Sequence, residues 1–191
     1  MNYILKRSIL FSALAFTSMV TVAGPTNVPF QATVAVIDTI NPLGAEACAL
    51  PDLPGMNAGS GMTIGVGDAS QLGRIAFVGT DCVRIIGATA SGLPIFYFRG
   101  QEGALTITTD NGDKLYGSYQ GSFIPTDEAP QGGLVPYKVE GGVFTISKGT
   151  GRFVNASAAG SLTGTENLNL DPSGQGPASN GTIYLKGRIS Y

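Results

Sequence analysis

The chain of 191 residues contains no histidine and no tryptophan, and only 13% of its residues are charged. Without histidine, neither a Ser-His-Asp nor a Cys-His catalytic arrangement can form, and no metal can bind through an imidazole ring. Acid–base chemistry would have to come from Asp, Glu, Tyr, Lys or Arg side chains. No basic patch is present to attract nucleic acid or an anionic lipid surface. We therefore expect no nucleic-acid partner, no cofactor and no metal ion.

Cysteine is scarce, since Cys48 and Cys82 are its two copies in the chain. Their spacing is far from that of a CxxC redox motif, and a zinc site would lack histidine. In an oxidising compartment an isolated pair most simply forms one disulfide, which contributes about 3–4 kcal/mol for a loop of this size. A redox or metal-binding pair is the alternative, and the structural disulfide is favoured over it.

Long apolar runs are scarce too, and the one that approaches a membrane span lies within residues 1–24. Two cations precede an uncharged apolar run there and small residues end it, which is the layout of a secretory signal peptide. Cleavage is expected after Ala23 or Gly24, with an uncleaved anchor as the alternative. We predict a bacterial protein that is secreted or periplasmic, with no membrane span after signal cleavage and with residues 25–191 as a single domain.

Helical periodicity is missing from the rest of the chain, and from Leu72 onward apolar residues alternate with a period of two. About eight strands with frequent turn signals predict an all-β antiparallel sandwich or barrel. The clearest hairpin flanks Asn111-Gly112, the pair preferred in a type I′ turn. Residues 41–62 are rich in Pro, Gly and Asn and predict a long loop, which Cys48 would pin and which can lie over an opening of the barrel.

Glycine is abundant, with 28 residues, and its positions carry two further predictions. The pair Gly141-Gly142 lies inside an apparent strand and predicts a bulge. Gly117 and Gly164 fall on inward positions, where a glycine either relieves the coiling strain of a barrel strand or leaves room for a cavity.

The stretch SKGTGRF has the composition of a phosphate-binding loop. Such a loop needs a helix after it, whereas both flanks here alternate like strands. We therefore predict a tight structural turn in which Gly149 or Gly151 takes a positive φ and Arg152 folds back on a carbonyl or carboxylate.

The stretch FTISKGTGRFVNASAAGSLTG resembles the strand–turn–strand signature of the dirigent and allene oxide cyclase families. The motifs NGDKLYGSYQG, TISKGTGRF, ASAAGSLTG and LKGRISY follow in the order found in secreted bacterial proteins of that superfamily, over residues 72–191. The resemblance implies an eight-stranded antiparallel, calycin-like barrel. Because the plant members work as dimers or trimers on small lipophilic molecules, it also implies a homo-oligomer and a small apolar ligand.

The functional residues of the plant relatives do not carry over. Arg152 and Ser157 stand where dirigent proteins tend to have an Asp and an Arg, and Lys148 replaces the first glycine of the motif. The catalytic glutamate of the cyclase lies on an early strand for which this sequence offers no matching motif. Neither plant activity is therefore assigned from matching residues.

Two groups of polar residues are candidates for a site. Tyr97 and Arg99, with Glu102, can form a polar spot at a barrel mouth, and Tyr119 lies on the apolar face of the neighbouring strand. We predict Tyr97, Arg99 and Tyr119 as ligand-binding residues, with a solvated rim as the alternative.

The predicted hairpin turn carries carboxylate and amide oxygens that suit calcium. These groups belong to Asp110, Asn111 and Asp113. The favoured interpretation is that these are ordinary polar residues of a hairpin turn, so no metal site is predicted.

Three functions agree with these features. The leading hypothesis is a barrel that binds a small apolar molecule. The second is a cyclase or isomerase that acts by placing its substrate in the barrel, which requires an Asp, Glu or Tyr facing the interior. The third is a structural or cell-surface interaction protein, or a small outer-membrane barrel, because the C-terminal strand alternates and ends in the aromatic Tyr191.

Overall fold

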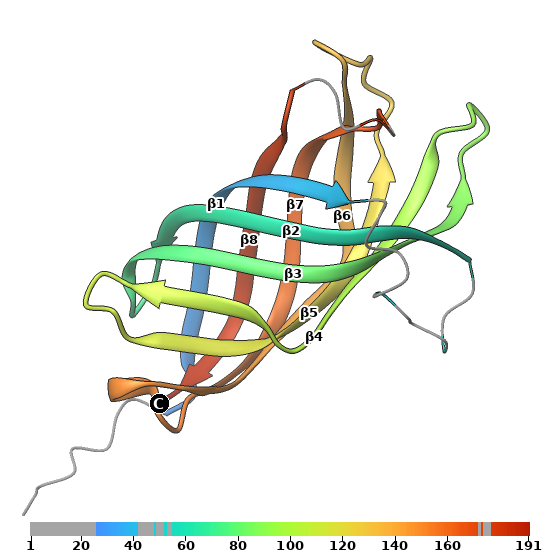
Figure 1. Cartoon of the computed structure of the whole chain (residues 1–191). Helices are drawn as coiled ribbons and strands as arrows, with labels where there is room; N and C mark the ends of the chain where they lie inside the picture. Colours follow the sequence, from blue (N-terminus) through green and yellow to red (C-terminus); the bar gives the residue numbers. More distant parts are fainter. Residues whose placement is uncertain (1–25, 42–47, 49–51, 53–54, 172, 174–176) are drawn as a thin grey trace, which may run out of the picture.

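The computed structural model describes residues 26–41, 48, 52, 55–171, 173 and 177–191. These residues form one closed antiparallel barrel in which each strand pairs with the next and β8 closes on β1 (Figure 1). The strands are β1 (Val28–Asn41), β2 (Met56–Ala69), β3 (Gly73–Ala88), β4 (Pro94–Thr109), β5 (Lys114–Pro125), β6 (Leu134–Gly149), β7 (Ser157–Asn169) and β8 (Ser179–Ser190). The prediction of an eight-stranded antiparallel barrel is confirmed, and the predicted signal peptide lies outside the described residues.

Strict alternation along the strands builds the core. In β1, Phe30, Ala32, Val34 and Val36 are buried and the alternate residues at 31, 33 and 35 are exposed, and the other strands follow a similar pattern. Closing the sheet into a barrel buries this apolar face of every strand. It also leaves no strand edge unpaired. Within the described part of the chain, no helix is long and apolar enough to cross a membrane.

One end of the barrel is closed by the stretch SKGTGRF. The short 3-10 turn η2 (Gly151–Phe153) follows β6. It places Phe153 fully inside the core, with the centroid of its ring 4.7 Å from that of Tyr191. Gly151 has a φ of 55°, while Arg152 stacks on Phe153 and donates to the carbonyl of Gln71 at 3.4 Å. The predicted structural turn is confirmed, with Gly151 as the glycine of positive φ.

Two other glycine predictions have clear outcomes. The register between β6 and β7 shifts at Val139 and Gly142, and Gly141 has a φ of 61°, so the predicted bulge is confirmed. A Cβ atom on Gly117 would lie 1.8 Å from the Thr145 carbonyl oxygen. This inward glycine therefore lets neighbouring strands approach each other closely and leaves no cavity.

The hairpin between β4 and β5 is confirmed, but its turn is not of type I′. That turn needs a positive φ at both central residues, and here Gly112 has one (85°) while Asn111 does not. The Thr109 N–H donates to the Asp113 carbonyl and the Gly112 N–H donates to the Thr109 carbonyl. The loop is therefore a three-residue turn that ends in a left-handed glycine, the next most common hairpin connection.

The predicted loop over residues 41–62 is too long at its C-terminal end, because β2 begins at Met56. The run MNAGSGM hides its strand character, since glycine contributes no side chain to a period-two pattern. Backbone pairing with β3 nevertheless continues along it, with a shift of register between Asn57 and Gly59.

The described residues of the loop between β1 and β2 bind the outer wall of the barrel. Cys48 forms the predicted disulfide with Cys82, Asp52 forms an ion pair with Arg99 at 2.9 Å, and the Gly55 carbonyl accepts a hydrogen bond from Arg84. The side chains of β3 and β4 in these contacts lie at outward positions of the alternation. These contacts place Cys48, Asp52 and Gly55 beside the wall.

Candidate functional site: a carboxyl network near the open end of the barrel

Five polar side chains from five strands point into the barrel. They are Asp38 on β1, Thr63 on β2, Asp81 on β3, Tyr119 on β5 and Glu166 on β7. Asp38 is 8% exposed and Glu166 is 4% exposed. Acidic residues are rarely buried to this degree unless they are paired, so this group marks a candidate site.

These side chains form a hydrogen-bonded network, which we call the carboxyl network. The Thr63 hydroxyl donates to Asp38 Oδ1 and interacts with the Tyr119 hydroxyl, which itself donates to Asp81 Oδ2 at 2.8 Å. The side chains of Asp38 and Glu166 also interact with each other. Two ionised carboxylates repel each other, so this contact favours a state in which one of the two carries a proton.

Burial sets the protonation of this network. It raises the pKa of Glu166 well above the usual range, and the neighbouring Asp38 charge adds to the shift. It also raises the pKa of Asp38, although hydrogen bonds from Glu166 and Thr63 oppose the change. Burial raises the pKa of Asp81 to about 6 and also raises the pKa of Tyr119. Glu166 is therefore the partner that holds a proton more tightly, and Asp81 changes its charge near pH 6.

Strand register and one small residue bring Asp38 and Glu166 together. Asp38 pairs with Ser179 of β8, and Glu166 pairs with Gly181 of the same strand. A Cβ atom on Gly181 would lie 2.3 Å from the Thr165 carbonyl oxygen and 2.4 Å from the Cγ atom of Glu166. The absence of a side chain at Gly181 thus gives the Glu166 side chain its space beside β8.

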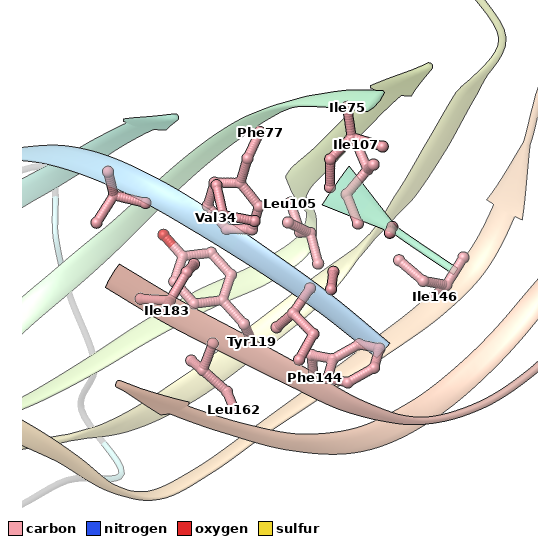
Figure 2. Close-up of a cluster of buried hydrophobic side chains, with 14 of the residues drawn as sticks. Val34, Ile75, Phe77, Leu105, Ile107, Tyr119, Phe144, Ile146, Leu162 and Ile183 are labelled. Atoms are coloured by element: carbon pink, nitrogen blue, oxygen red, sulfur yellow. The ribbon is translucent and has the colours of Figure 1, made fainter. Parts of the chain in front are cut away.

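Two further glycines make room for Tyr119. A Cβ atom on Gly79 would lie 2.5 Å from the Tyr119 hydroxyl oxygen, and one on Gly100 would lie 2.5 Å from its ring carbon Cε1. Phe77 and Phe98 pack around the same ring, at centroid distances of 6.4 and 6.0 Å. Tyr119 is thereby fixed inside the apolar core with its hydroxyl on the side away from Phe144 (Figure 2).

The interior around the carboxyl network is almost filled. A cavity of about 20 Å³ lies between Thr63, Asp81, Tyr119 and Glu166 and the apolar side chains beneath them. That volume suits about one water molecule. Apolar side chains fill the middle of the barrel below this cavity (Figure 2).

Two larger hollows lie at the end of the barrel opposite η2. The apolar hollow has a volume of about 330 Å³ and is lined chiefly by Ile40, Ala58, Ile85, Phe96 and Leu170. The acidic hollow has a volume of about 240 Å³ and is lined chiefly by Asp38, Thr39, Asn169, Asp171 and Ser179. Ile40, Asn169 and Asp171 line both hollows, so they adjoin. Asp38 connects the acidic hollow to the carboxyl network.

Among the residues predicted to bind a ligand, Tyr119 is in the interior and Tyr97 and Arg99 are on the outer wall. Phe96 and Phe98 take the inward positions of β4, which leaves the alternate residues facing out. Arg99 binds Asp52 through two hydrogen bonds of 2.9 Å and lies 5.9 Å from the Tyr97 ring. The structure therefore separates the predicted group into an outer pair and one interior residue.

The sequence contains a signal for the carboxyl network that the prediction missed. Asp38 continues the inward series of Val34 and Val36, and Glu166 stands between Leu162 and Leu168 on the inward face of β7. An acidic residue at a position where the alternation predicts a buried side chain is the pattern that would have identified both acids.

The oxygen-rich hairpin turn satisfies its own hydrogen bonds. The Asn111 amide donates to Asp113 Oδ2 at 2.9 Å, and the Thr109 hydroxyl donates to Asn111 Oδ1. In the part of the chain that the structure describes, no group of His, Cys, Asp and Glu is arranged to hold a metal ion.

The outer wall carries one apolar patch, over β1, β2 and β3, which lie side by side across the barrel (Figure 1). Ile37, Ile64 and Val78 pair directly across these strands, and Val66 beside them is 63% exposed. These residues, with the alanines at 35 and 76, line a shallow hollow of about 470 Å³. Such a patch is a candidate contact surface.

The fold and its interior define a closed antiparallel barrel with buried acids near one end. Comparisons with protein-family models, with curated proteins and with solved structures found no match to the chain. The resemblance of residues 72–191 to the dirigent and allene oxide cyclase families therefore stays a prediction from the sequence.

Proposed function

We propose that the protein binds a small, mainly apolar molecule with a polar head group at the open end of the barrel. The observation that carries this proposal is the apolar hollow of about 330 Å³ that adjoins the Asp38 side of the carboxyl network. Small-molecule sites are typically apolar hollows of about 300–1,000 Å³ with a few polar groups that orient the ligand. An apolar hollow that adjoins a second hollow lined by Asp38 and Asp171 matches that description.

The ligand position in this proposal is the mouth of the barrel. The interior cavity of about 20 Å³ has no space for an organic molecule. An apolar body would instead contact Ile85, Phe96 and Leu170, and its head group would lie toward Asp38. Small lipophilic ligands of the families that the sequence resembles agree with this chemistry.

A titration with the neutral fluorescent probe N-phenyl-1-naphthylamine tests the proposal. We expect saturable binding with one site per chain. Ala58→Trp fills the apolar hollow and should abolish it, whereas Ala159→Trp places the same bulk at an exposed position of β7 and should preserve it. Circular dichroism of both variants verifies the fold. Absence of saturable binding, or equal binding by the two variants, would overturn the proposal.

A second candidate function is acid–base catalysis, and the Asp38–Glu166 contact favours it. In such a pair, Asp38, which lines the acidic hollow, takes a proton from one atom of the bound molecule and returns it to another atom of that molecule, while Glu166 lies behind it. Asp38 ends in the protonation state in which it began. This balance is that of an isomerisation or a ring closure, the reaction class that placement in a barrel would serve.

Hydrogen exchange into a bound ketone tests this candidate. With 2-nonanone in D₂O, we expect the protein to accelerate deuterium uptake next to the carbonyl, as measured by mass spectrometry. Asp38→Asn should abolish the acceleration while 2-nonanone still binds. Uptake that is no faster with the protein than without it would eliminate the catalytic candidate and leave the binding proposal intact.

The apolar patch on β1–β3 supports a third candidate, an interaction protein or a homo-oligomer that uses this surface.

The outer-membrane alternative has less support. Such barrels are apolar outside and polar inside, whereas this barrel is apolar inside and carries Ser, Thr and Lys on the outer faces of β7 and β8.

A further inference from the structure

We infer that the head group of the ligand is a cation, most simply a primary ammonium group held between Asp38 and Asp171. This inference rests on the proposed function, because it specifies the ligand of the same site. The geometry that points to it is the acidic hollow, in which the side chains facing the adjoining apolar hollow are acids and neutral acceptors.

The charges around this hollow have one sign. Asp38 and Asp171 line it, and Asp81 and Glu166 lie behind it in the carboxyl network. Among the described residues that line the acidic hollow, the apolar hollow or the interior cavity, none is a lysine or an arginine. Any ligand that enters the hollow therefore meets a negative potential without a compensating protein cation.

One carboxyl oxygen of each buried acid also lacks a hydrogen-bond donor among the described residues. Among the described residues, no N–H or O–H group donates to Asp38 Oδ2, Asp81 Oδ1 or Glu166 Oε2, and of these three acids Asp38 lines the acidic hollow. Buried polar atoms in folded proteins nearly always have a partner, so missing donors indicate a ligand that brings its own. A primary ammonium group brings three donors and a positive charge together.

The remaining groups on the acidic hollow are suited to the same head group. Asn169 and Thr39 supply oxygen acceptors, and Ser179 uses its hydroxyl oxygen to accept from the Asn169 N–H at 2.9 Å. Hydrogen bonds from Ser173 hold the pKa of Asp171 below its usual range, so this carboxylate remains charged. A carboxylate or phosphate head would be repelled here, and a hydroxyl head would leave the charge uncompensated.

The apolar hollow gives the ligand its second property. Ile40 lines both hollows, so a molecule that spans them places its charged end on Asp38 and Asp171 and its apolar body on Ile85 and Phe96. The class of ligand is therefore an amphiphilic amine. Exposed cations at this end of the barrel do not interfere, because Arg84 and Arg99 face outward and bind the Gly55 carbonyl and Asp52.

Protons and the ammonium group compete for the same oxygens. Of the titratable groups that face the site, Asp38 comes from β1, Asp81 from β3, Tyr119 from β5, and Glu166 and Asp171 from β7 and its following loop. β2, β4, β6 and β8 contribute no titratable side chain to the three spaces. Burial raises the pKa of Asp38, so a lower pH favours its neutral form and weakens amine binding, whereas binding of a neutral analogue does not weaken.

The experiment compares 1-octylamine, 1-octanol and octanoate by isothermal titration calorimetry on the full chain at pH 7 and pH 4. These probes share one chain length and differ in the charge of the head group. We expect the amine to bind at least tenfold more tightly than the alcohol at pH 7, octanoate to bind most weakly, and the preference for the amine to shrink at pH 4.

Asp38→Asn should reduce the preference for the amine at least tenfold while the alcohol binds as before. Asp171→Asn tests the same charge at an exposed position, where folding is not at risk, and should reduce the preference several-fold. The control Asp110→Asn removes an exposed acid at the far end of the barrel and should change nothing.

The outcomes distinguish the proposed cationic head group from the proposed binding site. Equal binding of amine and alcohol, with no effect of either site variant, would overturn the cationic head group and leave the binding site itself standing. No binding of any probe would overturn both.

Discussion

The Tyr119 hydroxyl donates a hydrogen bond of 2.8 Å to Asp81 Oδ2 inside a barrel whose interior is mainly apolar. The two residues come from β5 and β3, which are not neighbours in the sheet, so the bond crosses the interior. The other oxygen of Asp81 has no donor. Tyr119 therefore provides the one hydrogen bond from the described residues that keeps this buried carboxyl group from being wholly unsatisfied.

Removal of that hydroxyl is expected to destabilise the protein. Tyr119→Phe leaves Asp81 without its donor, and an unsatisfied buried acceptor costs about 1–3 kcal/mol. Tyr184→Phe removes a hydroxyl from an exposed tyrosine on β8 and should change the free energy of unfolding by less than about 0.5 kcal/mol. Urea denaturation of both variants measures the difference. Equal stabilities for the two variants would show that the Tyr119–Asp81 bond does not support the fold.

The stability of the protein is expected to fall as the pH rises from about 4 to above 6. Burial raises the pKa of Asp81 from 3.8 to about 6 in the folded state, so the folded protein holds this proton more tightly than the unfolded chain. The stabilisation is fully present below the unfolded pKa, is lost as the pH rises through the folded pKa, and amounts to about 3 kcal/mol.

Chemical denaturation at pH 4 and pH 7 measures this change. Asp81→Asn should remove the part of the pH dependence that belongs to Asp81, and Asp81→Asn/Glu166→Gln should remove most of the rest, because burial also raises the pKa of Glu166. Asp110→Asn, at an exposed turn, serves as the control and should keep the full dependence. A wild-type protein that is more stable at pH 7 than at pH 4 would contradict the buried position of these acids.

A methyl group at Gly181 is expected to disrupt the Asp38–Glu166 contact. The added Cβ would lie 2.3 Å from the Thr165 carbonyl oxygen, which belongs to the backbone and cannot move aside easily. Overpacking of this kind costs about 1–3 kcal/mol. Gly87→Ala is the matched control, because its Cβ would meet nothing nearer than the Ile95 Cδ1 atom at 3.9 Å.

Thermal unfolding compares the two alanine variants, and calorimetry with 1-octylamine reports on the site. We expect Gly181→Ala to lower the melting temperature and the affinity for the amine together, while Gly87→Ala changes neither. If Gly181→Ala unfolds like Gly87→Ala, the position of the Glu166 side chain beside β8 does not depend on the missing side chain.

The disulfide between Cys48 and Cys82 joins residues that are 34 positions apart in the sequence. By the chain-entropy argument, a loop of this size is stabilised by about 3–4 kcal/mol. The variant Cys48→Ser/Cys82→Ser should therefore melt about 10 °C below the wild type. A reducing agent should lower the melting temperature of the wild type and leave the double variant unchanged. No difference between oxidised and reduced wild type would show that this crosslink does not stabilise the barrel.

Local patterns in the sequence are sufficient to predict much of the fold. The alternation of Leu105, Ile107 and Leu115 predicts the strands, since a strand exposes every second side chain to the same face. Gly151 predicts a turn because few other residues accept its φ of 55°. Each of these features depends on a few neighbouring residues, which is why it can be inferred without tertiary contacts.

The type of the hairpin turn and the start of β2 were predicted wrongly because neither depends on local sequence alone. Asn111-Gly112 fits two turn geometries, and the pairing of Thr109 with Asp113 selects the three-residue form. The glycine-rich start of β2 becomes a strand because β3 offers it backbone partners from Ile85 onward. Both outcomes are decided by hydrogen bonds between segments, which local composition does not report.

The sequence by itself determined that this chain is an antiparallel β protein with a disulfide and a glycine turn, because periodicity, cysteine number and turn chemistry are local properties. Only the tertiary structure decided that Asp38 and Glu166 interact across β8, and that Arg99 faces outward to Asp52. Asp38 and Glu166 are 128 positions apart in the chain (166 − 38). Their contact exists because closing the sheet into a barrel brings the inward faces of β1 and β7 within reach of each other.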